Sequence, residues 1–263
     1  MKLAFIGTGN MGGAIFRAVI QKVVSDCCFL SNRSFEKTVL LASEYGANAC
    51  ETNTDCAWNA DVVFLGVKPY SVSDVLKEIA PVLREDTLIV SMAAGVSGDT
   101  MRKALGRENP IIRIMPNTPC EIGKGLVLLA PIGDVKPEAV SMLSDLLSCC
   151  GTVFVSDESH ADAAMTIGGC TPAFTYLFIE ALADGAVRTG IPRKEAIEWV
   201  AQTVAGSAEM VLQTGRHPGA LKDAVCSPGG STIEGIAVLE SHAFRAAAMD
   251  AIVAAFEKTK KLG

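Results

Sequence analysis

The sequence predicts an α/β protein, with an N-terminal Rossmann-type doubly wound parallel sheet and an all-helical C-terminal dimerisation domain. Three observations carry this prediction. Glycines in the pattern Gly7-x-Gly9-x-x-Gly12 directly follow a short apolar run. Short apolar runs then alternate with amphipathic stretches, as in βαβ units. After residue 155 the strand-like runs stop and Ala-rich helical patterns take over, so we expect domains at 1–155 and 156–263.

The composition is typical of a well-packed globular chain of one large domain or two modest ones. The 263 residues are 49% hydrophobic and 6% aromatic, and 20% are charged, which excludes an intrinsically disordered chain. The net charge of −6 argues against general nucleic-acid binding. No apolar stretch reaches the roughly 20 residues that span a bilayer. We therefore expect a small-molecule substrate, with neither nucleic acid nor membrane as a partner.

The cysteines indicate the compartment. There are nine, an odd number without any C-x-x-C pair, and Cys27-Cys28 and Cys149-Cys150 are directly adjacent. This arrangement suits neither ordinary disulfides nor tetrahedral metal sites. We expect small buried thiols in a reducing environment, a cytoplasmic protein and no bound metal.

The expected elements of the first domain follow from short buried runs and amphipathic periodicity. Helices are expected over 10–22, 35–44 and 69–83. Because strands separated by helical patterns form right-handed parallel crossovers, the strands should join one sheet. They are expected at 2–6, 27–31, 61–66, 87–91, 111–115 and 126–130, with a last run at 153–155.

The second domain reads as a series of helices. They are expected over 172–187, 191–213, a short stretch from 218, 231–239 and 241–261. Small residues in the first two allow helices to approach closely, which predicts a helix–helix interface between subunits. These residues are Ala183, Gly185, Ala186, Ala205, Gly206 and Ala208.

The glycine loop is expected to bind the diphosphate of a dinucleotide. In such loops the three glycines provide a tight turn, close approach of the backbone to the diphosphate, and close helix–strand packing. The exposed backbone N–H groups and the helix dipole then favour the anion. The expected contacts are Gly7, Thr8, Gly9, Asn10, Met11 and Gly12.

The end of the second strand favours NADP(H) over NAD(H). An NAD site usually has Asp or Glu there to hold the ribose hydroxyls, but this segment is Ser31-Asn32-Arg33-Ser34. Arg33 can pair with a 2′-phosphate, and Ser31, Asn32 and Ser34 can donate hydrogen bonds to it. The alternative is an ordinary polar loop that begins a helix. NADPH is the preferred cofactor and NADH the second choice.

Four further segments complete the pattern. Three follow predicted strands and should gather at the carboxyl edge of the sheet, where ligands bind in such folds; they are Gly66-Val67-Lys68-Pro69, Ala93-Ala94-Gly95-Val96 and Arg113-Ile114-Met115-Pro116-Asn117-Thr118-Pro119. The fourth contains K-D-x-V-x-S-P-G-G-x-T between Lys222 and Thr232. Together with Asn10-Met11, these segments closely resemble the pyrroline-5-carboxylate reductase family, in order and over essentially the whole chain.

The resemblance implies hydride transfer from NAD(P)H to the C=N carbon of the cyclic imine 1-pyrroline-5-carboxylate, giving L-proline in the final step of proline biosynthesis. It also implies that the substrate carboxylate binds at Ser227, Gly229, Gly230, Ser231 and Thr232. Thr232 is the expected catalytic residue, with its hydroxyl, or a water molecule, hydrogen-bonded to the imine. The alternative is that Ser231 or Thr232 merely caps a helix.

On the cofactor side, the resemblance implies that Val67, Lys68 and Pro69 surround the nicotinamide ribose and diphosphate. It places Asn53 at the adenine ribose, although an Asn that opens a helix is usually a cap. The nicotinamide ring is expected beside Ala93, Ala94, Met115, Pro116 and Asn117.

One segment departs from the family pattern. Members commonly carry S-G-S-G-P-A at the start of the first long helix of the C-terminal domain, whereas this chain has Gly168-Gly169-Cys170-Thr171-Pro172-Ala173, which leaves the substrate contacts there open. Two alternative functions explain fewer of these sequence features. A β-hydroxyacid dehydrogenase needs a lysine that 167–180 lacks, and a non-catalytic NADP sensor needs no S-P-G-G-S-T segment. The resemblance also implies a homodimer, with assembly into a larger homo-oligomer as an open alternative.

Overall fold

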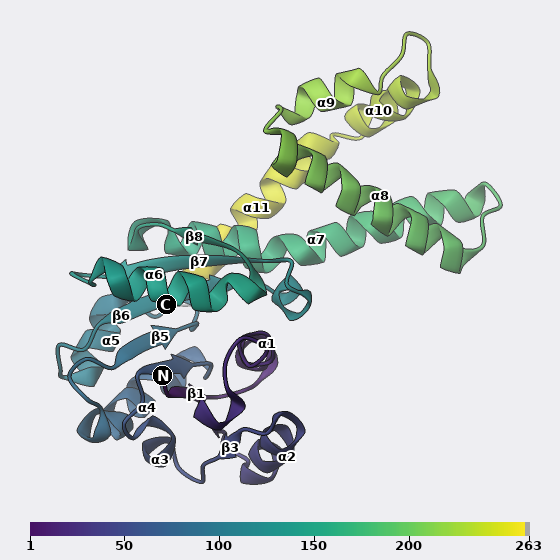
Figure 1. Ribbon diagram of the computed structural model, residues 1–263. Helices are drawn as coiled ribbons and strands as arrows, with labels where there is room; N and C mark the ends of the chain where they lie inside the picture. Colours follow the sequence, from purple (N-terminus) through teal and green to yellow (C-terminus); the bar gives the residue numbers. More distant parts are fainter. Residues whose placement is uncertain (261–263) are drawn as a thin grey trace. The chain divides into compact units, whose positions relative to one another are not determined.

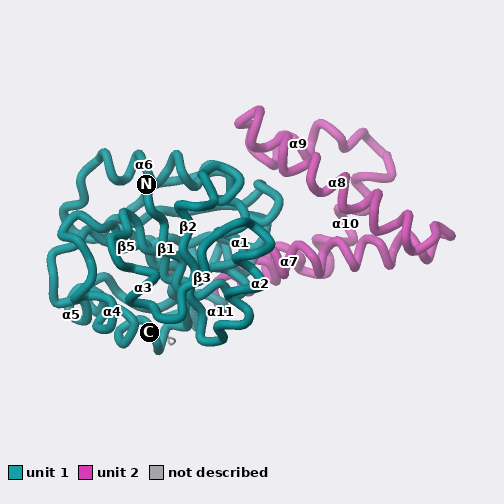
Figure 2. The backbone as a smooth tube through the Cα atoms, turned by 60° about the horizontal axis from the view of Figure 1, so that its bottom comes forward, with its two compact units in different colours: residues 1–170, 255–263 teal, residues 171–254 magenta. Residues whose placement is uncertain are grey.

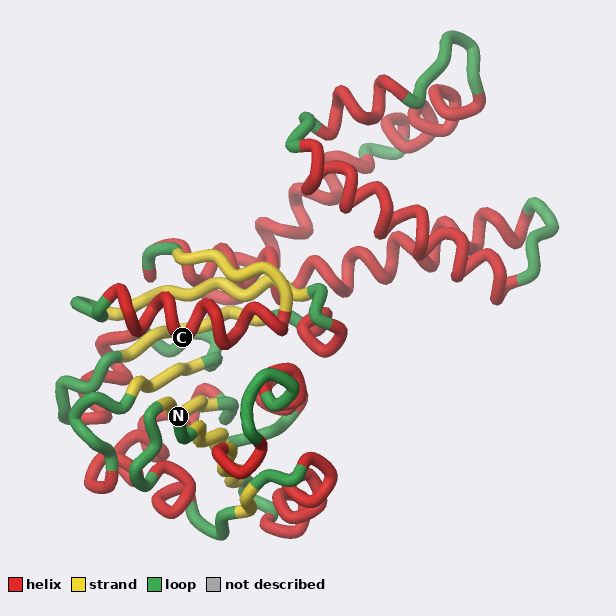
Figure 3. The backbone as a smooth tube through the Cα atoms, viewed as in Figure 1, coloured by secondary structure: helices red, strands yellow, loops and turns green. Residues whose placement is uncertain are grey.

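The computed structural model describes residues 1–260 and divides the chain into two compact units. The first comprises Met1–Cys170 with Ala255–Gly263, and the second comprises Thr171–Ala254 (Figure 2). Every strand belongs to the first unit, as the yellow segments of Figure 3 show. Within the described residues, no helix is long and apolar enough to cross a membrane.

The first unit is built on one eight-stranded sheet with the order β3-β2-β1-β4-β5-β6-β7-β8 (Figure 1). The chain starts in the middle, moves outward to β3, and then returns past β1 to build the other half. This reversal of direction beside β1 is the topological switch point at which doubly wound sheets bind ligands. The strands are β1 Leu3–Ile6, β2 Cys28–Ser31, β3 Asn48–Ala49, β4 Val62–Leu65, β5 Leu88–Ser91, β6 Ile111–Pro116, β7 Gly125–Ile132 and β8 Gly151–Val155.

Most neighbouring strands are parallel, as expected, but β6 and β7 run antiparallel. Their register pairs Ile111 with Ile132 and Pro116 with Val127. The connection is too short for a parallel crossover, which needs a dozen or more residues. It consists of a tight 3₁₀ turn over Thr118–Ile122 with a residue or two on either side. The sheet is therefore mixed, and the parallel order resumes between β7 and β8.

Helices cover both faces of the sheet, which confirms the doubly wound architecture. On β1, Leu3 and Phe5 join the core beneath α1, α2 and α6, whereas Ala4 and Ile6 join the core beneath α3, α4 and α5. All four side chains are buried because a central parallel strand is covered on both sides. The helices are α1 Asn10–Val19, α2 Phe35–Tyr45, α3 Asn53–Ala57, α4 Val72–Ile79, α5 Gly98–Leu105 and α6 Pro137–Leu147.

The helical part of the chain matches the expected order, with one correction. The first long helix, expected to begin at Pro172, starts eleven residues earlier and contains Pro172 in its interior. Pro172 has no backbone N–H to donate to the carbonyl of residue 168, so the helix continues through this position without that hydrogen bond. The helices are α7 Ala161–Arg188, α8 Arg193–Thr214, α9 Pro218–Ala224, α10 Ser231–Ser241 and α11 Phe244–Lys260, and Lys261, the expected end of the last, lies outside the described residues.

The two geometric units divide within α7, between Cys170 and Thr171, and not at residue 155. The first turns of α7 pack on the sheet, where Ala161 is fully buried beside Met115, Leu128 and Ala130. The helix then continues into the second unit without a linker.

Candidate cofactor and substrate sites

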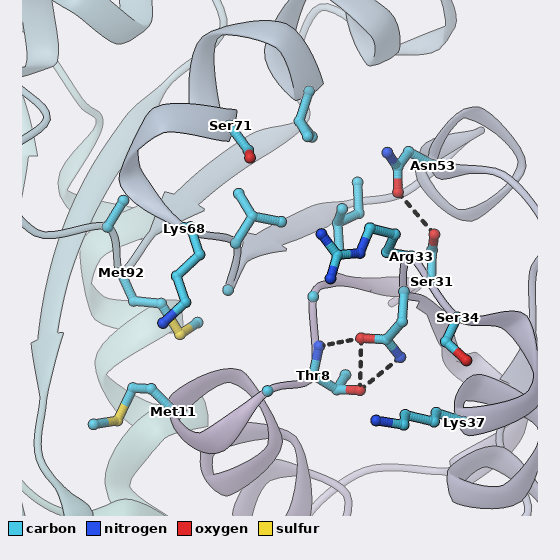
Figure 4. A pocket seen from close by; sticks show the side chains of 18 of the residues that line it. Thr8, Met11, Ser31, Arg33, Ser34, Lys37, Asn53, Lys68, Ser71 and Met92 are labelled. Carbon is cyan, nitrogen blue, oxygen red and sulfur yellow. Dashed lines mark hydrogen bonds between the residues drawn. The ribbon is translucent and has the colours of Figure 1, made fainter.

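A pocket of about 1130 Å³ lies at the carboxyl edge of β1, β2, β4 and β5 (Figure 4). The loops after these four strands form its walls, so the pocket sits at the switch point of the sheet. Most of the expected cofactor residues line it. They are Gly7, Thr8, Gly9, Asn10, Met11, Ser31, Asn32, Arg33, Asn53, Val67, Lys68, Pro69, Ala93 and Ala94.

The glycines of the loop have different structural roles. Gly7 has a φ of +88°, and a Cβ on Gly12 would lie 2.1 Å from the Gly7 carbonyl oxygen. A Cβ on Gly66 would lie 2.2 Å from the same oxygen. These three glycines therefore let β1, α1 and the loop after β4 pack backbone against backbone. Gly12 itself is buried beneath the pocket and is not one of its lining residues.

Gly9 differs from the others because it borders open space. A Cβ built on Gly9 would meet no atom within 4 Å. Gly9 is also the N-cap of α1, without any side-chain hydrogen bond at the cap and without an acidic residue in the first turn. The first backbone N–H groups of α1 are thus left for a ligand, and the helix dipole favours an anion there. A methyl group at residue 9 would stand in this open space.

Basic residues gather at one end of the pocket. Arg33, Ser34 and Lys37 lie together in Figure 4, and both cations are exposed. Lys37 was not among the residues expected from the sequence, although its position in a helix indicates a role. A lysine in the first turn of a helix opposes the helix dipole, and Lys37 occupies the first turn of α2. Arg17 on α1 is a further lining cation.

Ser31 and Asn53 at this end bond to each other. The Ser31 hydroxyl donates to Asn53 Oδ1 at 2.7 Å, and Asn53 Nδ2 donates to Glu78 Oε2 at 2.8 Å. Asn53 is not the cap of α3, since the hydroxyl oxygen of Thr52 accepts from the backbone N–H of Asp55. The cap interpretation of Asn53 is therefore wrong, and its side chain lines the pocket.

The opposite end of the pocket is less polar. Met11, Lys68 and Met92 lie there in Figure 4, and Ala93 and Ala94 continue the wall. The small alanine side chains leave room for a flat ring.

Met115, Pro116 and Asn117 are not lining residues of this pocket. Met115 is buried against Leu128 and Ala130, and Pro116 is still paired within the sheet. Asn117 Oδ1 accepts from the backbone N–H of Leu126 at 2.9 Å, so its side chain secures the turn between β6 and β7.

The expected carboxylate site lies in the second unit, at the start of α10. Gly229 has a φ of +67°, and the Gly230 N–H donates to the Ser227 carbonyl at 3.0 Å, closing the turn before the helix. A Cβ on Gly230 would lie 2.3 Å from Ser227 Oγ. The turn therefore favours glycine at 229, whereas a side chain at 230 would require the Ser227 hydroxyl to rotate away.

Neither Ser231 nor Thr232 caps this helix. The N-cap is Gly230, and no side-chain hydrogen bond is made at the cap. Both side chains are exposed, and neither hydroxyl forms a hydrogen bond to another residue within the described range 1–260. The cap interpretation is wrong here too. The hydroxyls and the first N–H groups of α10 are accessible to an anionic ligand.

Comparison with known proteins places the chain in a family. The family model described as pyrroline-5-carboxylate reductase dimerisation matches residues 158–262, and the one described as NADP oxidoreductase, coenzyme F420-dependent, matches residues 2–95. The chain is 43% identical over 263 residues to pyrroline-5-carboxylate reductase of Escherichia coli (strain K12), covering 99% of this chain and 98% of that protein. The chain belongs to the pyrroline-5-carboxylate reductase family. It is also 37% identical to the Methanosarcina acetivorans member, covering 100% of this chain and 98% of that protein.

Solved structures of family members share the fold. A Plasmodium falciparum pyrroline carboxylate reductase with NADP bound has a TM-score of 0.90 and 33% identity, covering 100% of this chain and 98% of that one. A Coxiella burnetii pyrroline-5-carboxylate reductase has a TM-score of 0.92 and 32% identity, with the same coverage. The predicted combination of a Rossmann-type domain and a helical dimerisation domain is thus confirmed.

Proposed function

We infer that this chain reduces 1-pyrroline-5-carboxylate to L-proline with NADPH, the final step of proline biosynthesis. The observation that carries this inference is the match to pyrroline-5-carboxylate reductases along the full chain, at 43% identity. The pocket adds a physical reason. It combines an open glycine cradle with exposed cations. The three residues directly after β2, Asn32, Arg33 and Ser34, include no carboxylate.

The residues of the first unit fit NADPH. The cradle at Gly9 and the first N–H groups of α1 suit the diphosphate, while Arg33, Ser34 and Lys37 suit the 2′-phosphate. Lys68, Val67 and Pro69 would surround the nicotinamide ribose, and Ala93 and Ala94 would leave space for the ring. When bound, NADPH supplies the hydride. NADH remains the alternative cofactor, because nothing in the glycine loop depends on the extra phosphate.

The second unit supplies the substrate contacts in this proposal. The N–H groups of Ser231 and Thr232, with the Ser231 hydroxyl, would hold the substrate carboxylate at the start of α10. The Thr232 hydroxyl would hydrogen-bond to the ring nitrogen, which must carry a proton for its carbon to accept a hydride. This proton stays on nitrogen in the product amine. The protein's main contribution is then orientation of the imine.

We also propose that the chain forms a homodimer through its helical part, with a larger homo-oligomer as the further possibility. The match to the dimerisation model covers residues 158–262. Apolar side chains on α7 and α8 are unusually open to solvent, with Trp199 at 56% exposure and Ile197 at 45%. The same two helices form an apolar hollow of about 180 Å³, which is lined by Leu182, Ala186, Ala196, Trp199, Val200, Thr203 and Val204. Apolar surface of this kind is typical of a subunit interface.

Two further proposals concern organisation and compartment. We propose residues 1–155 as the NADP-binding domain and 156–263 as the substrate and dimerisation domain, supported by the matches at 2–95 and 158–262. We also propose that the protein works in the cytoplasm. All nine cysteines are free, which suits a reducing compartment.

A single assay tests the proposed reaction. NADPH oxidation is followed with 1-pyrroline-5-carboxylate as substrate, and NADP⁺ reduction is followed with 3-hydroxyisobutyrate in parallel. We expect turnover only with the imine, with proline as the product by chromatography. Absence of imine-dependent oxidation, or turnover of the hydroxy acid instead, would overturn the proposal.

A further inference from the structure

Asn32 is the first residue after β2, and its side chain is directed at the glycine loop. The backbone N–H of Thr8 donates to Asn32 Oδ1 at 2.6 Å, and Asn32 Nδ2 donates to Thr8 Oγ1 at 2.8 Å (the dashed lines at Thr8 in Figure 4). From the sequence, Asn32 is expected to donate to a 2′-phosphate. In the structure, the amide is half-buried and engaged with the loop that faces the diphosphate.

The orientation of this amide follows from its neighbours. A backbone N–H can only donate, so the atom that faces the N–H of Thr8 must be the carbonyl oxygen of Asn32. The Asn32 NH₂ group then points to Thr38, and Nδ2 donates to Thr38 Oγ1 at 3.1 Å. Thr38 Oγ1 accepts this bond because its own proton is donated to the Ser34 carbonyl at 3.2 Å. Each polar group of the network has a complementary partner.

The network continues the contacts between β1 and β2 past the ends of the two strands. At the end of the β1–β2 pairing, the Gly7 N–H donates to the Ser31 carbonyl at 2.8 Å. One residue further along, beyond both strands, the Thr8 N–H donates to the side-chain carbonyl of Asn32. The glycine loop is thereby held to β2 just before α1 begins.

Thr38 anchors the other side of the network. It lies one turn into α2, it is fully buried, and it is not a lining residue of the pocket. A bound dinucleotide therefore has no direct route to the Thr38 hydroxyl. Any effect of Thr38 on cofactor binding has to pass through Asn32 or through the loop that carries Ser34.

We propose that Asn32 is a positioning residue that holds the glycine loop in the shape needed for the diphosphate, and not a ligand of the 2′-phosphate. It supports NADH and NADPH alike, because both carry the diphosphate. Discrimination between them is left to Arg33 and Lys37, which are exposed at the adenosine end of the pocket. This inference rests on the proposed binding of NADPH.

The test compares Asn32→Ala with Arg33→Gln in the full-length protein. Dissociation constants for NADPH and for NADH are measured by calorimetry, beside the melting temperature of each variant. We expect Asn32→Ala to weaken both dinucleotides by the same factor, about tenfold for a lost hydrogen bond to the loop backbone. Arg33→Gln is expected to weaken NADPH alone. A loss confined to NADPH in Asn32→Ala, or no loss at all, would overturn the positioning role.

A second pair keeps the inference testable if Asn32→Ala does not fold. Thr38→Val removes the hydroxyl at constant shape, and Thr38→Ser retains it. We expect Thr38→Val to weaken both dinucleotides equally by a few-fold, and Thr38→Ser to restore them. Unequal effects on the two dinucleotides would contradict the proposal. A wild-type protein that binds neither dinucleotide would instead contradict the proposed function, so the two failures are distinguishable.

Discussion

The carbonyl oxygen of Gly7 lies 2.1 Å from the point where a Cβ on Gly12 would stand. The loop and the first turn of α1 therefore touch through backbone atoms, with no space for even a methyl group. This contact holds the helix start at the end of β1, where the first N–H groups of α1 border the pocket. Gly7 and Gly12 thus serve packing, whereas Gly9 borders the open space of the pocket.

Replacement of Gly12 by alanine should destabilise the fold. The new methyl group would overlap the Gly7 carbonyl, which is backbone and cannot rotate away. Overpacking of this kind costs about 1–3 kcal/mol, and a clash with backbone belongs at the upper end. Thermal denaturation of Gly12→Ala should show a melting temperature several degrees below the wild type. An unchanged melting temperature would mean that the loop relaxes freely.

Replacement of Gly9 by alanine should leave the stability of the fold unchanged and weaken the use of NADPH. Its φ of −67° lies outside the left-handed region that favours glycine, and a Cβ there meets no atom within 4 Å. We expect the melting temperature to stay close to that of the wild type, while the KM for NADPH rises at least about tenfold because the methyl group enters the space for the diphosphate. Steady-state kinetics beside thermal denaturation checks this, with Gly12→Ala as the matched comparison. Unaltered kinetics would show that the diphosphate binds elsewhere.

Removal of the Thr232 hydroxyl should affect turnover but not stability. The side chain is exposed and does not cap α10, so Thr232→Ala loses no internal hydrogen bond in the structure. We expect kcat to fall at least about tenfold, as for a lost hydrogen bond to the reacting group, with the NADPH dissociation constant unchanged. Thr232→Ser, which retains the hydroxyl, should keep most of the activity. Equal turnover of the wild type and Thr232→Ala would remove Thr232 from the proposed mechanism.

The thiol of Cys149 should react at an unusually low pH. A hydrogen bond from the Cys150 thiol, aided by the Lys22 ammonium and opposed by burial, lowers the pKa of Cys149 to about 7. Because the thiolate is the reactive form, the alkylation rate with iodoacetamide should rise with a midpoint near pH 7. Burial raises the pKa of Cys28 to about 11, so Cys28 should stay unlabelled in the same range.

Mass spectrometry of pulse-labelled protein between about pH 6 and about pH 9 measures this titration. Cys149→Ser identifies the labelled position, since Cys150 is adjacent and buried. Lys22→Ala should move the midpoint upward, because it removes the nearby positive charge. A midpoint above about pH 8.5, the value of an ordinary thiol, would contradict the assigned environment.

Local patterns were sufficient for the main elements of the fold. The apolar run before Gly7 and the glycine spacing predicted β1, the turn and α1, because these features depend on neighbours within a dozen residues. The short strand β3, Asn48–Ala49, and the helices α5 and α6 were not singled out. The start of α7 was also missed, since Pro172, a residue type typical of helix starts, lies in the interior of this helix.

The site was predicted in position more than in detail. Most of the cofactor residues line one pocket because parallel strands deliver their following loops to the same edge of the sheet. Met115, Pro116 and Asn117 do not, because β6 continues through Pro116 and pairs with β7. No local sequence pattern distinguishes a strand that ends at the edge of the pocket from one that continues past this edge.

The sequence by itself determined the family, the order of most elements and the positions of the two glycine turns, because glycines and helix starts act through local backbone geometry. Only the tertiary structure decided what each polar side chain does. Asn32 and Arg33 are adjacent in the chain, yet the first bonds to the glycine loop and the second is exposed at the pocket. Hydrogen-bond partners that lie 24 residues apart in the chain, as Thr8 and Asn32 do, meet only when β1 and β2 pair.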